Sequence, residues 1–181
     1  MINNSVKFII SIIGKSNVGK TTLIEKMLPA FSARGYKIGT IKHHYHDYDS
    51  DIRGKDSWRH QTAGARQTII SSPNKMTFFS KLDSELSIDE LARYFDNSDI
   101  IITDGYKKGN KPKIEVFRPS HYGATIAGPE DNLIAYATDS PDYEFKLKAP
   151  VLNLNDAESV TEFILRHFKL PQIKNRGEAN E

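Results

Sequence analysis

Short apolar runs alternate along the chain with segments in which apolar residues recur every three or four positions. Residues 8–13 are almost all β-branched or aromatic and stop at a glycine, which is typical of a strand buried on both faces of a parallel sheet. Apolar side chains then recur at helical spacing from Leu23 to Phe31, and Gly35 is placed to end that helix. Pro29 lies inside this segment, and we expect it to bend the helix or to end its regular part early.

The same pattern predicts several further elements. A strand over residues 36–41 would complete a strand, helix, strand unit with a crossover connection. Further strands are expected at 68–70, 76–79, 100–102, 133–136 and 151–152. Helices are expected at 55–63, at 88–95 behind a capping box from Ser87 to Glu90, and at 157–168 behind Asp156. Residues 113–117 alternate polar and apolar side chains, which favours an edge strand or a hairpin arm over a core strand.

The alternation of strands and helices predicts an α/β fold. We expect a mainly parallel sheet flanked by helices on both sides, with a small antiparallel hairpin extension. A chain of 181 residues is long enough for one domain with a full core and short for two. We therefore predict one domain over residues 1–170, followed by a polar C-terminal tail over residues 171–181.

Composition narrows the classes of function. The chain has 25 basic and 23 acidic side chains, and its formal charge of +2 gives no electrostatic reason to expect a nucleic-acid or membrane partner. It has no cysteine, which excludes disulfides and thiolate chemistry and fits a cytosolic protein. The first seven residues lack a basic signal-peptide start, and the apolar run at 8–13 is too short to cross a membrane. We expect a cytoplasmic protein.

The loop after the first strand carries a phosphate-binding motif. It satisfies the pattern G-x-x-x-x-G-K-[ST] at every fixed position, between a predicted strand and a predicted helix. Its residues are Gly14, Lys15, Ser16, Asn17, Val18, Gly19, Lys20 and Thr21. In this motif backbone N–H groups surround the phosphates, Lys20 reaches the β- and γ-phosphates, and the Thr21 hydroxyl ligates Mg²⁺. The sequence therefore predicts a P-loop NTPase fold that binds a nucleoside triphosphate.

Lys15 lies at a variable position of the motif and leaves two interpretations open. Some dimeric P-loop ATPases and GTPases carry a second lysine there that reaches into the partner's site. Alternatively, the side chain points to solvent, because a variable position tolerates lysine and one extra charge beside a phosphate site is electrostatically ordinary.

Two further segments supply candidate ligands for a metal ion. Asp104 follows the predicted strand at 100–102, where a P-loop protein needs a carboxylate to hold Mg²⁺ or to orient the attacking water. Three histidines and three aspartates also fall within residues 43–51. We interpret this stretch as a nucleotide-responsive loop in which Asp47 or Asp49 approaches Mg²⁺. A solvated polar loop is the alternative.

Taken together, the motifs resemble the MobB family, the GTP-binding adapter proteins of molybdopterin guanine dinucleotide synthesis. The matching segments run in family order: Gly14 to Thr22, Ile41 to His44 with Asp47 and Asp49, Gly54 to Ser57 leading to Ala63-Gly64-Ala65, Asp104 to Lys107, Lys113 to Arg118, and Ala135 to Asp139. The chain departs from the family at Asp104, where such proteins commonly have glutamate. The shorter side chain puts direct activation of water by Asp104 in doubt.

The resemblance implies a homodimer that binds GTP with Mg²⁺, hydrolyses it weakly, and assists the guanylyltransferase MobA in attaching GMP to molybdopterin. It also implies that the loop through Thr22 binds the nucleotide and that Asp139 reads the base, although Asp139 is equally placed to form a turn before Ser140-Pro141. Two other functions stay open. One is a small-molecule kinase that uses the same loop, and the other is a metallochaperone-type GTPase that uses His43, His44 and His46.

Overall fold

The computed structural model describes residues 7–44, 46 and 49–171. It divides the chain into two compact units, Met1–His43 with Ala92–Glu181 and, between them in sequence, His44–Leu91. The domain boundary predicted at residue 170 stays a prediction, and the polar tail falls almost wholly outside the described residues.

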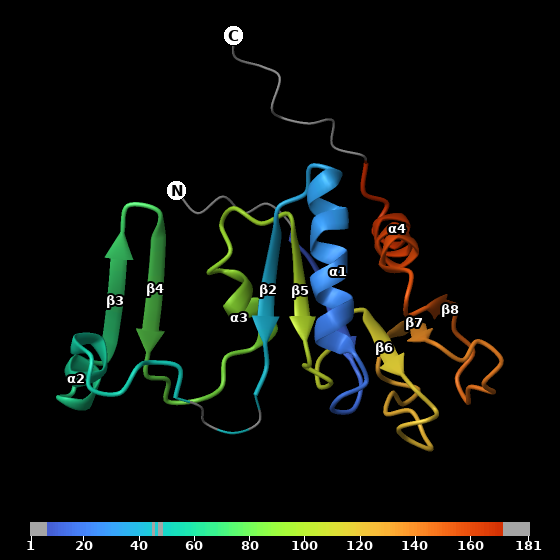
Figure 1. Ribbon diagram of the computed structural model, residues 1–181, viewed down its shortest axis with the longest axis horizontal. Helices are drawn as coiled ribbons and strands as arrows, with labels where there is room; N and C mark the ends of the chain where they lie inside the picture. The colour runs from blue at the N-terminus through green and yellow to red at the C-terminus, as the bar shows by residue number, and fades with distance from the viewer. Residues whose placement is uncertain (1–6, 45, 47–48, 172–181) are drawn as a thin grey trace, which may run out of the picture. The chain divides into compact units, whose positions relative to one another are not determined.

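The first unit is built on a parallel sheet of six strands (Figure 1). In sheet order the strands are β2 (Ile38–Lys42), β5 (Ile100–Asp104), β1 (Phe8–Ile13), β6 (Lys113–Phe117), β7 (Leu133–Thr138) and β8 (Val151–Asn153). Every neighbouring pair is parallel, so all six carboxyl ends lie at the same edge of the sheet. The loops that leave this edge are where ligands of open α/β sheets bind.

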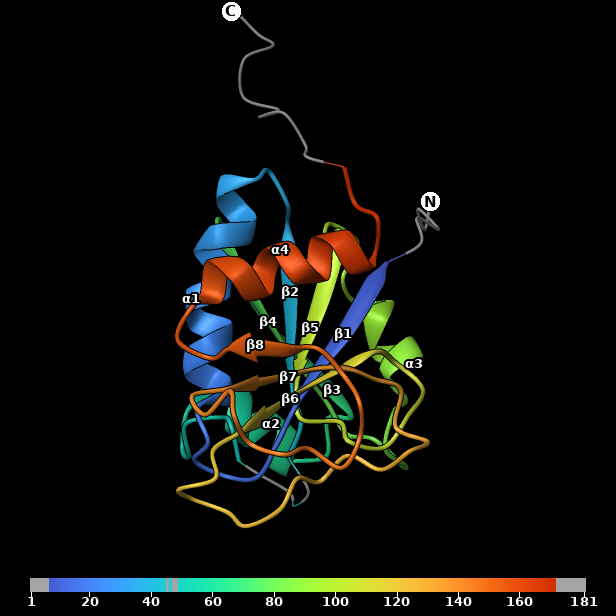
Figure 2. The same cartoon turned by 90° about the vertical axis from the view of Figure 1, so that its right-hand side faces the viewer.

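Two helices, α1 (Lys20–Ala33) and α4 (Ala157–His167), pack on the sheet of this unit (Figure 2). Their apolar side chains share one buried cluster with alternate residues of the strands, among them Ile10, Ile12, Ile100, Ile102, Ile114 and Val116. The apolar residues that alternate along the strands and those at helical spacing in α1 and α4 therefore pack together in one core. Asp156 caps α4 as predicted, because its carboxylate accepts from the Ser159 N–H at 3.0 Å.

Helix α1 begins at the phosphate-loop motif and ends at a glycine. Gly35 has φ 82°, its N–H donates to the Ser32 carbonyl, and the Tyr36 N–H donates to the Phe31 carbonyl. The Tyr36 and Phe31 rings meet edge to face across this end, which completes a Schellman motif. Pro29 lies inside the helix, which continues to Ala33, so the expectation that Pro29 could end it early is wrong.

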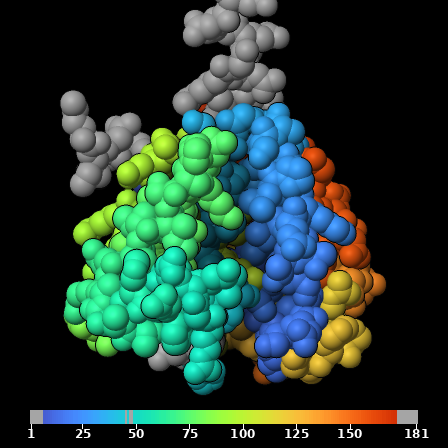
Figure 3. All heavy atoms as spheres, turned by 60° about the vertical axis from the view of Figure 1, so that its left-hand side comes forward, coloured from blue at the N-terminus to red at the C-terminus, as the bar shows by residue number. Residues whose placement is uncertain are grey.

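The second unit contains the predicted antiparallel hairpin, β3 (Gln67–Ser72) paired with β4 (Lys75–Ser80), preceded by the short helix α2 (Asp56–Thr62). Figure 3 shows these elements as spheres in teal and green. The capping box is present at the start of α3 (Ile88–Ala92): the Ser87 N–H donates to Glu90 Oε2 at 2.8 Å, and the Glu90 N–H donates to Ser87 Oγ at 3.3 Å. The helix ends three residues earlier than expected.

Strand β6 corrects the prediction of an edge strand or hairpin arm at residues 113–117. It lies between β1 and β7, and all five of its residues are buried. Lys113 Nζ donates to three backbone carbonyls, those of Gly109, Lys111 and Asp131. The Glu115 carboxylate accepts from the N–H groups of Ile126 and Ala127. The polar positions in the pattern thus face loop backbone instead of solvent, as buried charges require.

None of the helices in the described part of the chain combines the length and the apolar composition needed to cross a bilayer. The cytoplasmic location stays a prediction from the sequence.

Candidate nucleotide-binding site

The phosphate loop connects β1 to α1 and uses backbone conformations that favour glycine. Gly14 has φ 143°, and a Cβ there would lie 2.4 Å from the Val116 carbonyl oxygen of β6. The loop can therefore pass this close to the neighbouring strand only without a side chain. Gly19 has φ 101° at the N-cap of α1, and Asn17 has φ 61°. These three positions bend the backbone around the start of the helix.

The N-terminus of α1 is left open to an anion. No side chain caps it, and its first turn has no acidic residue. The other described helices each carry an acidic side chain there, which offsets the positive end of the helix dipole. The N–H groups at the start of α1 are thus available to a phosphate.

Two side chains contact the Asp104 carboxylate beside this helix end, and Lys20 begins the helix and contacts the adjoining loop. The Thr21 hydroxyl donates to Asp104 Oδ2 at 2.9 Å. Lys42, at the end of β2, forms an ion pair with the same oxygen at 2.6 Å. Lys20 Nζ donates to the Lys15 carbonyl at 2.6 Å, across the turn of the loop. Sequence reasoning did not single out Lys42, although its position at the end of a predicted strand was a signal.

The site fits Mg²⁺ by the chemistry of its oxygens. Asp104 is buried, and its Oδ1 atom has no hydrogen-bond partner among the residues that the structure describes. A buried carboxylate oxygen without a partner is costly unless a cation or water meets it. Together with the Thr21 hydroxyl it offers hard oxygen ligands, which Mg²⁺ prefers alongside phosphate and water.

Lys20 is held in a partly desolvated place. Burial lowers the pKa of its ammonium group below the ordinary value, the Asp104 carboxylate opposes this change, and the charge of Lys42 adds to it. A bound phosphate would supply the negative charge that this lysine lacks.

The outer side of the phosphate loop is held by the segment that follows β6. Arg118 Nε donates to the Val18 carbonyl at 3.0 Å, and the Tyr122 hydroxyl donates to the Ser16 carbonyl at 3.0 Å. The Lys15 ammonium lies 4.7 Å from the centre of the Tyr122 ring, in a cation–π contact. Neither Arg118 nor Tyr122 was predicted as a site residue, since their contacts depend on the placement of β6 beside β1.

Asp139, the predicted base reader, lies at the end of β7 and pairs with Arg118. Its Oδ2 atom accepts from Arg118 Nη1, and its Oδ1 atom accepts from the Ser140 hydroxyl at 3.2 Å. Thr22 lies nearby and lines a small cavity of about 70 Å³. The other residues around this cavity are Gly19, Leu23, Lys26, Arg118, Leu154 and Asn155.

The histidine and aspartate loop is only partly described. The His43 ring lies 4.2 Å from the Tyr106 ring, and the backbone N–H of His43 donates to the Asp104 carbonyl at 3.1 Å. Asp49 is exposed and accepts from the Asp51 N–H, while Asp47 lies outside the described residues. Within the ranges that the structure describes, no group of three or more histidines, aspartates or glutamates is arranged to hold a metal ion. The predicted approach of Asp49 to Mg²⁺ stays a prediction.

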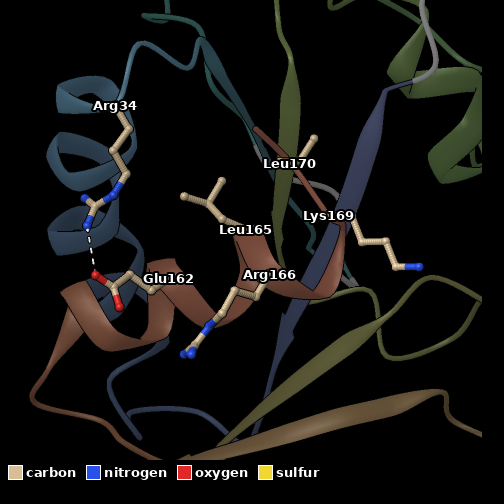
Figure 4. A pocket seen from close by; sticks show the side chains of 6 residues that line it. All are labelled: Arg34, Glu162, Leu165, Arg166, Lys169 and Leu170. Atoms are coloured by element: carbon tan, nitrogen blue, oxygen red, sulfur yellow. Dashed lines mark hydrogen bonds and ion pairs between the residues drawn. The ribbon is translucent and has the colours of Figure 1, made fainter. Parts of the chain in front are cut away.

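A second, larger cavity of about 560 Å³ lies between α1 and α4 (Figure 4). It is lined by Arg34, Glu162, Leu165, Arg166, Lys169 and Leu170. Arg34 lies just past the C-terminus of α1 and points at Glu162. A helix of 14 residues spans roughly 20 Å, so this cavity is remote from the phosphate loop at the other end of α1.

Comparison with known proteins agrees with this geometry. The family model "Molybdopterin guanine dinucleotide synthesis protein B" (MobB) matches residues 9–139. The chain is 31% identical over 172 residues to the molybdopterin-guanine dinucleotide biosynthesis adapter protein of Haemophilus influenzae, covering 92% of this chain and 94% of that protein. It is 37% identical over 161 residues to the protein of the same name from Escherichia coli, covering 83% and 87%.

Solved structures give the same result for the fold. The crystal structure of Bacillus subtilis MobB is similar with a TM-score of 0.70 and 26% identity, covering 94% of this chain and 99% of that one. The MobB protein homolog from Bacillus stearothermophilus is similar with a TM-score of 0.65 and 21% identity, covering 90% and 99%.

Proposed function

The chain belongs to the MobB family, and from this premise we propose that it is a GTP-binding adapter in the biosynthesis of molybdopterin guanine dinucleotide. In this role it binds GTP with Mg²⁺, hydrolyses it slowly, and assists a MobA-like guanylyltransferase that attaches GMP to molybdopterin. The relatives from Haemophilus influenzae and Escherichia coli are named as adapter proteins of this biosynthesis, which supports the role.

One observation carries the nucleotide part of the proposal. Thr21 donates to Asp104 at the N-terminus of the helix that Lys20 begins, this end has no acidic cap, and Asp104 keeps a buried oxygen that no described residue satisfies. Phosphate oxygens, Mg²⁺ and its waters supply the missing partners. The other Asp104 oxygen already accepts from Thr21 and Lys42. We therefore assign Asp104 to holding Mg²⁺ and not to activating water, and slow hydrolysis follows from this assignment.

For the base we propose Asp139. It lies at the end of β7, at the same edge of the sheet as the phosphate loop, and its side chain is 25% exposed. A carboxylate there can accept from the N1–H and the amino group of guanine, whereas adenine presents no such pair of donors. Arg118 joins Asp139 to the phosphate loop through the Val18 carbonyl.

For assembly we propose a homodimer. Ile69 and Met76 are 57% and 66% exposed on the hairpin of β3 and β4. The register places them on one face together with Phe78. An isolated two-stranded sheet is marginally stable, and a contiguous apolar face on it is typical of an interface. A second copy of this chain is the occupant that fits the family resemblance.

The test is a nucleotide panel measured by calorimetry. Wild-type protein is titrated with GTP, XTP and ATP, with Mg²⁺ or EDTA, and then with molybdopterin and the guanylyltransferase. We expect GTP to bind best and only with Mg²⁺. Lys20→Ala abolishes binding, because the lysine neutralises the β- and γ-phosphates. Asp139→Asn moves the preference from GTP to XTP, because an amide donor faces the additional carbonyl of xanthine.

Lys37→Ala is the matched control, since Lys37 is exposed just beyond the far end of the same helix. The nucleotide assignment is wrong if Lys20→Ala binds GTP as tightly as the wild type. Phosphate transfer from GTP to a small metabolite would favour the kinase alternative. Stoichiometric nickel or zinc binding without nucleotide would favour the metallochaperone alternative, for which the described residues show no assembled ligand group.

A further inference from the structure

Two side chains from one segment donate hydrogen bonds to the backbone of the phosphate loop. Arg118 and Tyr122 lie in the loop that follows β6, and they donate to the carbonyls of Val18 and Ser16, each at 3.0 Å. These two carbonyls lie two residues apart within the motif. The hydrogen bonds therefore hold the central part of the phosphate loop and not its ends.

The direction of these carbonyls matters for anion binding. A loop that presents successive N–H groups to phosphate must turn its carbonyls the other way, because each peptide plane carries both groups on opposite sides. The Val18 carbonyl is partly buried and needs a donor, and a donor at the exposed Ser16 carbonyl fixes the direction of that peptide group. Arg118 and Tyr122 supply those donors before any ligand binds. They lower the cost of arranging the N–H groups when phosphate arrives.

Arg118 makes a second contact with a different part of the site. Its Nη1 atom pairs with the Asp139 carboxylate while Nε holds the Val18 carbonyl. The pairing follows from the sheet, since Phe117 lies opposite Thr138 in the register of β6 and β7 and the next residues leave both strands together. The two side chains are 27% and 25% exposed, so the pair is partly shielded from solvent.

From this geometry we propose that Arg118 is a positioning residue that couples the phosphate loop to Asp139, so that phosphate recognition and base recognition are one linked event. The inference rests on the proposed binding of a nucleoside triphosphate and deepens it. The planar guanidinium is suited to this task, because its N–H groups point in fixed directions and hold two acceptors at once. Lysine has one nitrogen, so it cannot present two donors as far apart as Nε and Nη1, which make the two contacts of Arg118.

The coupling predicts that replacing Asp139 changes the affinity for a ligand without a base. A residue that contacts only the base would not have this effect. Inorganic tripolyphosphate has no base, so replacing a residue that only reads the base leaves its affinity unchanged. If Asp139 orients Arg118, then Asp139→Ala also weakens tripolyphosphate, by about threefold, and Arg118→Met weakens it by about tenfold. In the double variant the Asp139 substitution has no further effect, because the residue through which it acts is gone.

The experiment is this double-mutant cycle, with the Mg²⁺ complexes of tripolyphosphate, GTP and ATP competed against a fluorescent GTP analogue. Arg118→Met is also expected to lower the ratio of GTP to ATP affinity, since Asp139 loses its partner. Arg34→Met is the matched control, because Arg34 at the far end of α1 also pairs with carboxylates, those of Glu158 and Glu162. Figure 4 shows the pair with Glu162. The Arg34→Met variant should leave all three affinities within twofold of the wild type.

Thermal unfolding of each variant separates loss of fold from loss of coupling, and Arg118→Lys replaces Arg118→Met if the latter does not fold. The inference is overturned if Asp139→Ala leaves tripolyphosphate binding unchanged, or if it weakens binding equally with and without Arg118. A wild-type protein that binds neither GTP nor tripolyphosphate would instead contradict the proposed function itself. The two failures are therefore distinguishable.

Discussion

Lys20 is a binding residue at a place where burial disfavours the charged form of its side chain. Burial lowers the pKa of its ammonium group, and the Asp104 carboxylate offsets only part of this effect. We expect Lys20→Met to keep or raise the melting temperature without nucleotide, because methionine fills similar space and carries no charge to desolvate. The same variant should lose GTP binding. Differential scanning calorimetry with and without GTP measures both effects.

Lys37→Met is the comparison and should change neither quantity, because Lys37 is exposed just beyond the far end of the same helix. A clear drop in melting temperature for Lys20→Met alone would show that the lysine stabilises the folded loop, for example through the Lys15 carbonyl, and would contradict this account.

At the scale of elements, the sequence predicted those helix ends and caps that depend on contacts between residues close together in the chain. The end of α1 at Gly35, the capping box at Ser87 and the cap at Asp156 were all recognisable, because each involves residues within five positions of one another. Strand β6 was not recognisable as a core strand. The partners that make Lys113 and Glu115 tolerable in the core lie in separate loops, and spacing along the sequence does not reveal them.

The same distinction applies to the candidate site, where some residues were predicted from local motifs and others make contacts that depend on the order of the strands. The motif predicted Lys20 and Thr21, and the end of an apolar strand predicted Asp104, because parallel strands end at a common edge. The contacts of Arg118 and Tyr122 with the loop could not be predicted, since they require β6 to lie next to β1. Residue types were thus readable from the sequence, while the pairings between distant segments came from the sheet order.

Glu115 in β6 gives a prediction on the dependence of stability on pH. Burial raises the pKa of its carboxyl group, against the opposing effects of the Ile126 and Ala127 N–H groups and the charge of Lys107. The folded protein therefore binds a proton more tightly than the unfolded chain. It follows that the free energy of unfolding falls as pH rises above the ordinary value of 4.5 and through the raised pKa.

We expect Glu115→Gln to show a flatter profile over this window, since glutamine does not titrate, although it loses one of the two backbone contacts. Urea unfolding at a series of pH values from 4.5 to neutrality measures the slope. Glu130→Gln, at an exposed loop position, should keep the wild-type slope. Equal slopes in all three proteins would mean that the carboxyl group of Glu115 titrates normally in the folded state.

At the scale of the whole molecule, the proposed homodimer rests on the exposed face of the hairpin of β3 and β4. The hairpin pairs with no further strand in the part of the chain that the structure describes, and it carries Ile69 and Met76 exposed on one face. We expect Ile69→Lys with Met76→Lys to convert a dimer into a monomer, because two charges at the centre of an apolar interface cannot be desolvated without partners. Sedimentation velocity at several concentrations measures the change.

Val151→Lys provides the comparison, since Val151 is also an exposed apolar strand residue, 40% exposed on β8 at the edge of the main sheet. That variant should remain dimeric. A wild type that sediments as a monomer at every concentration would refute the homodimer, and a dimer that survives both lysines would place the interface elsewhere.

Because the hairpin unit and the nucleotide unit are separate, the lysine variant should bind GTP as the wild type does unless the partner contributes to the site. A loss of GTP affinity on becoming monomeric would therefore reveal a group supplied by the second copy, with the exposed Lys15 the first residue to replace in such a search.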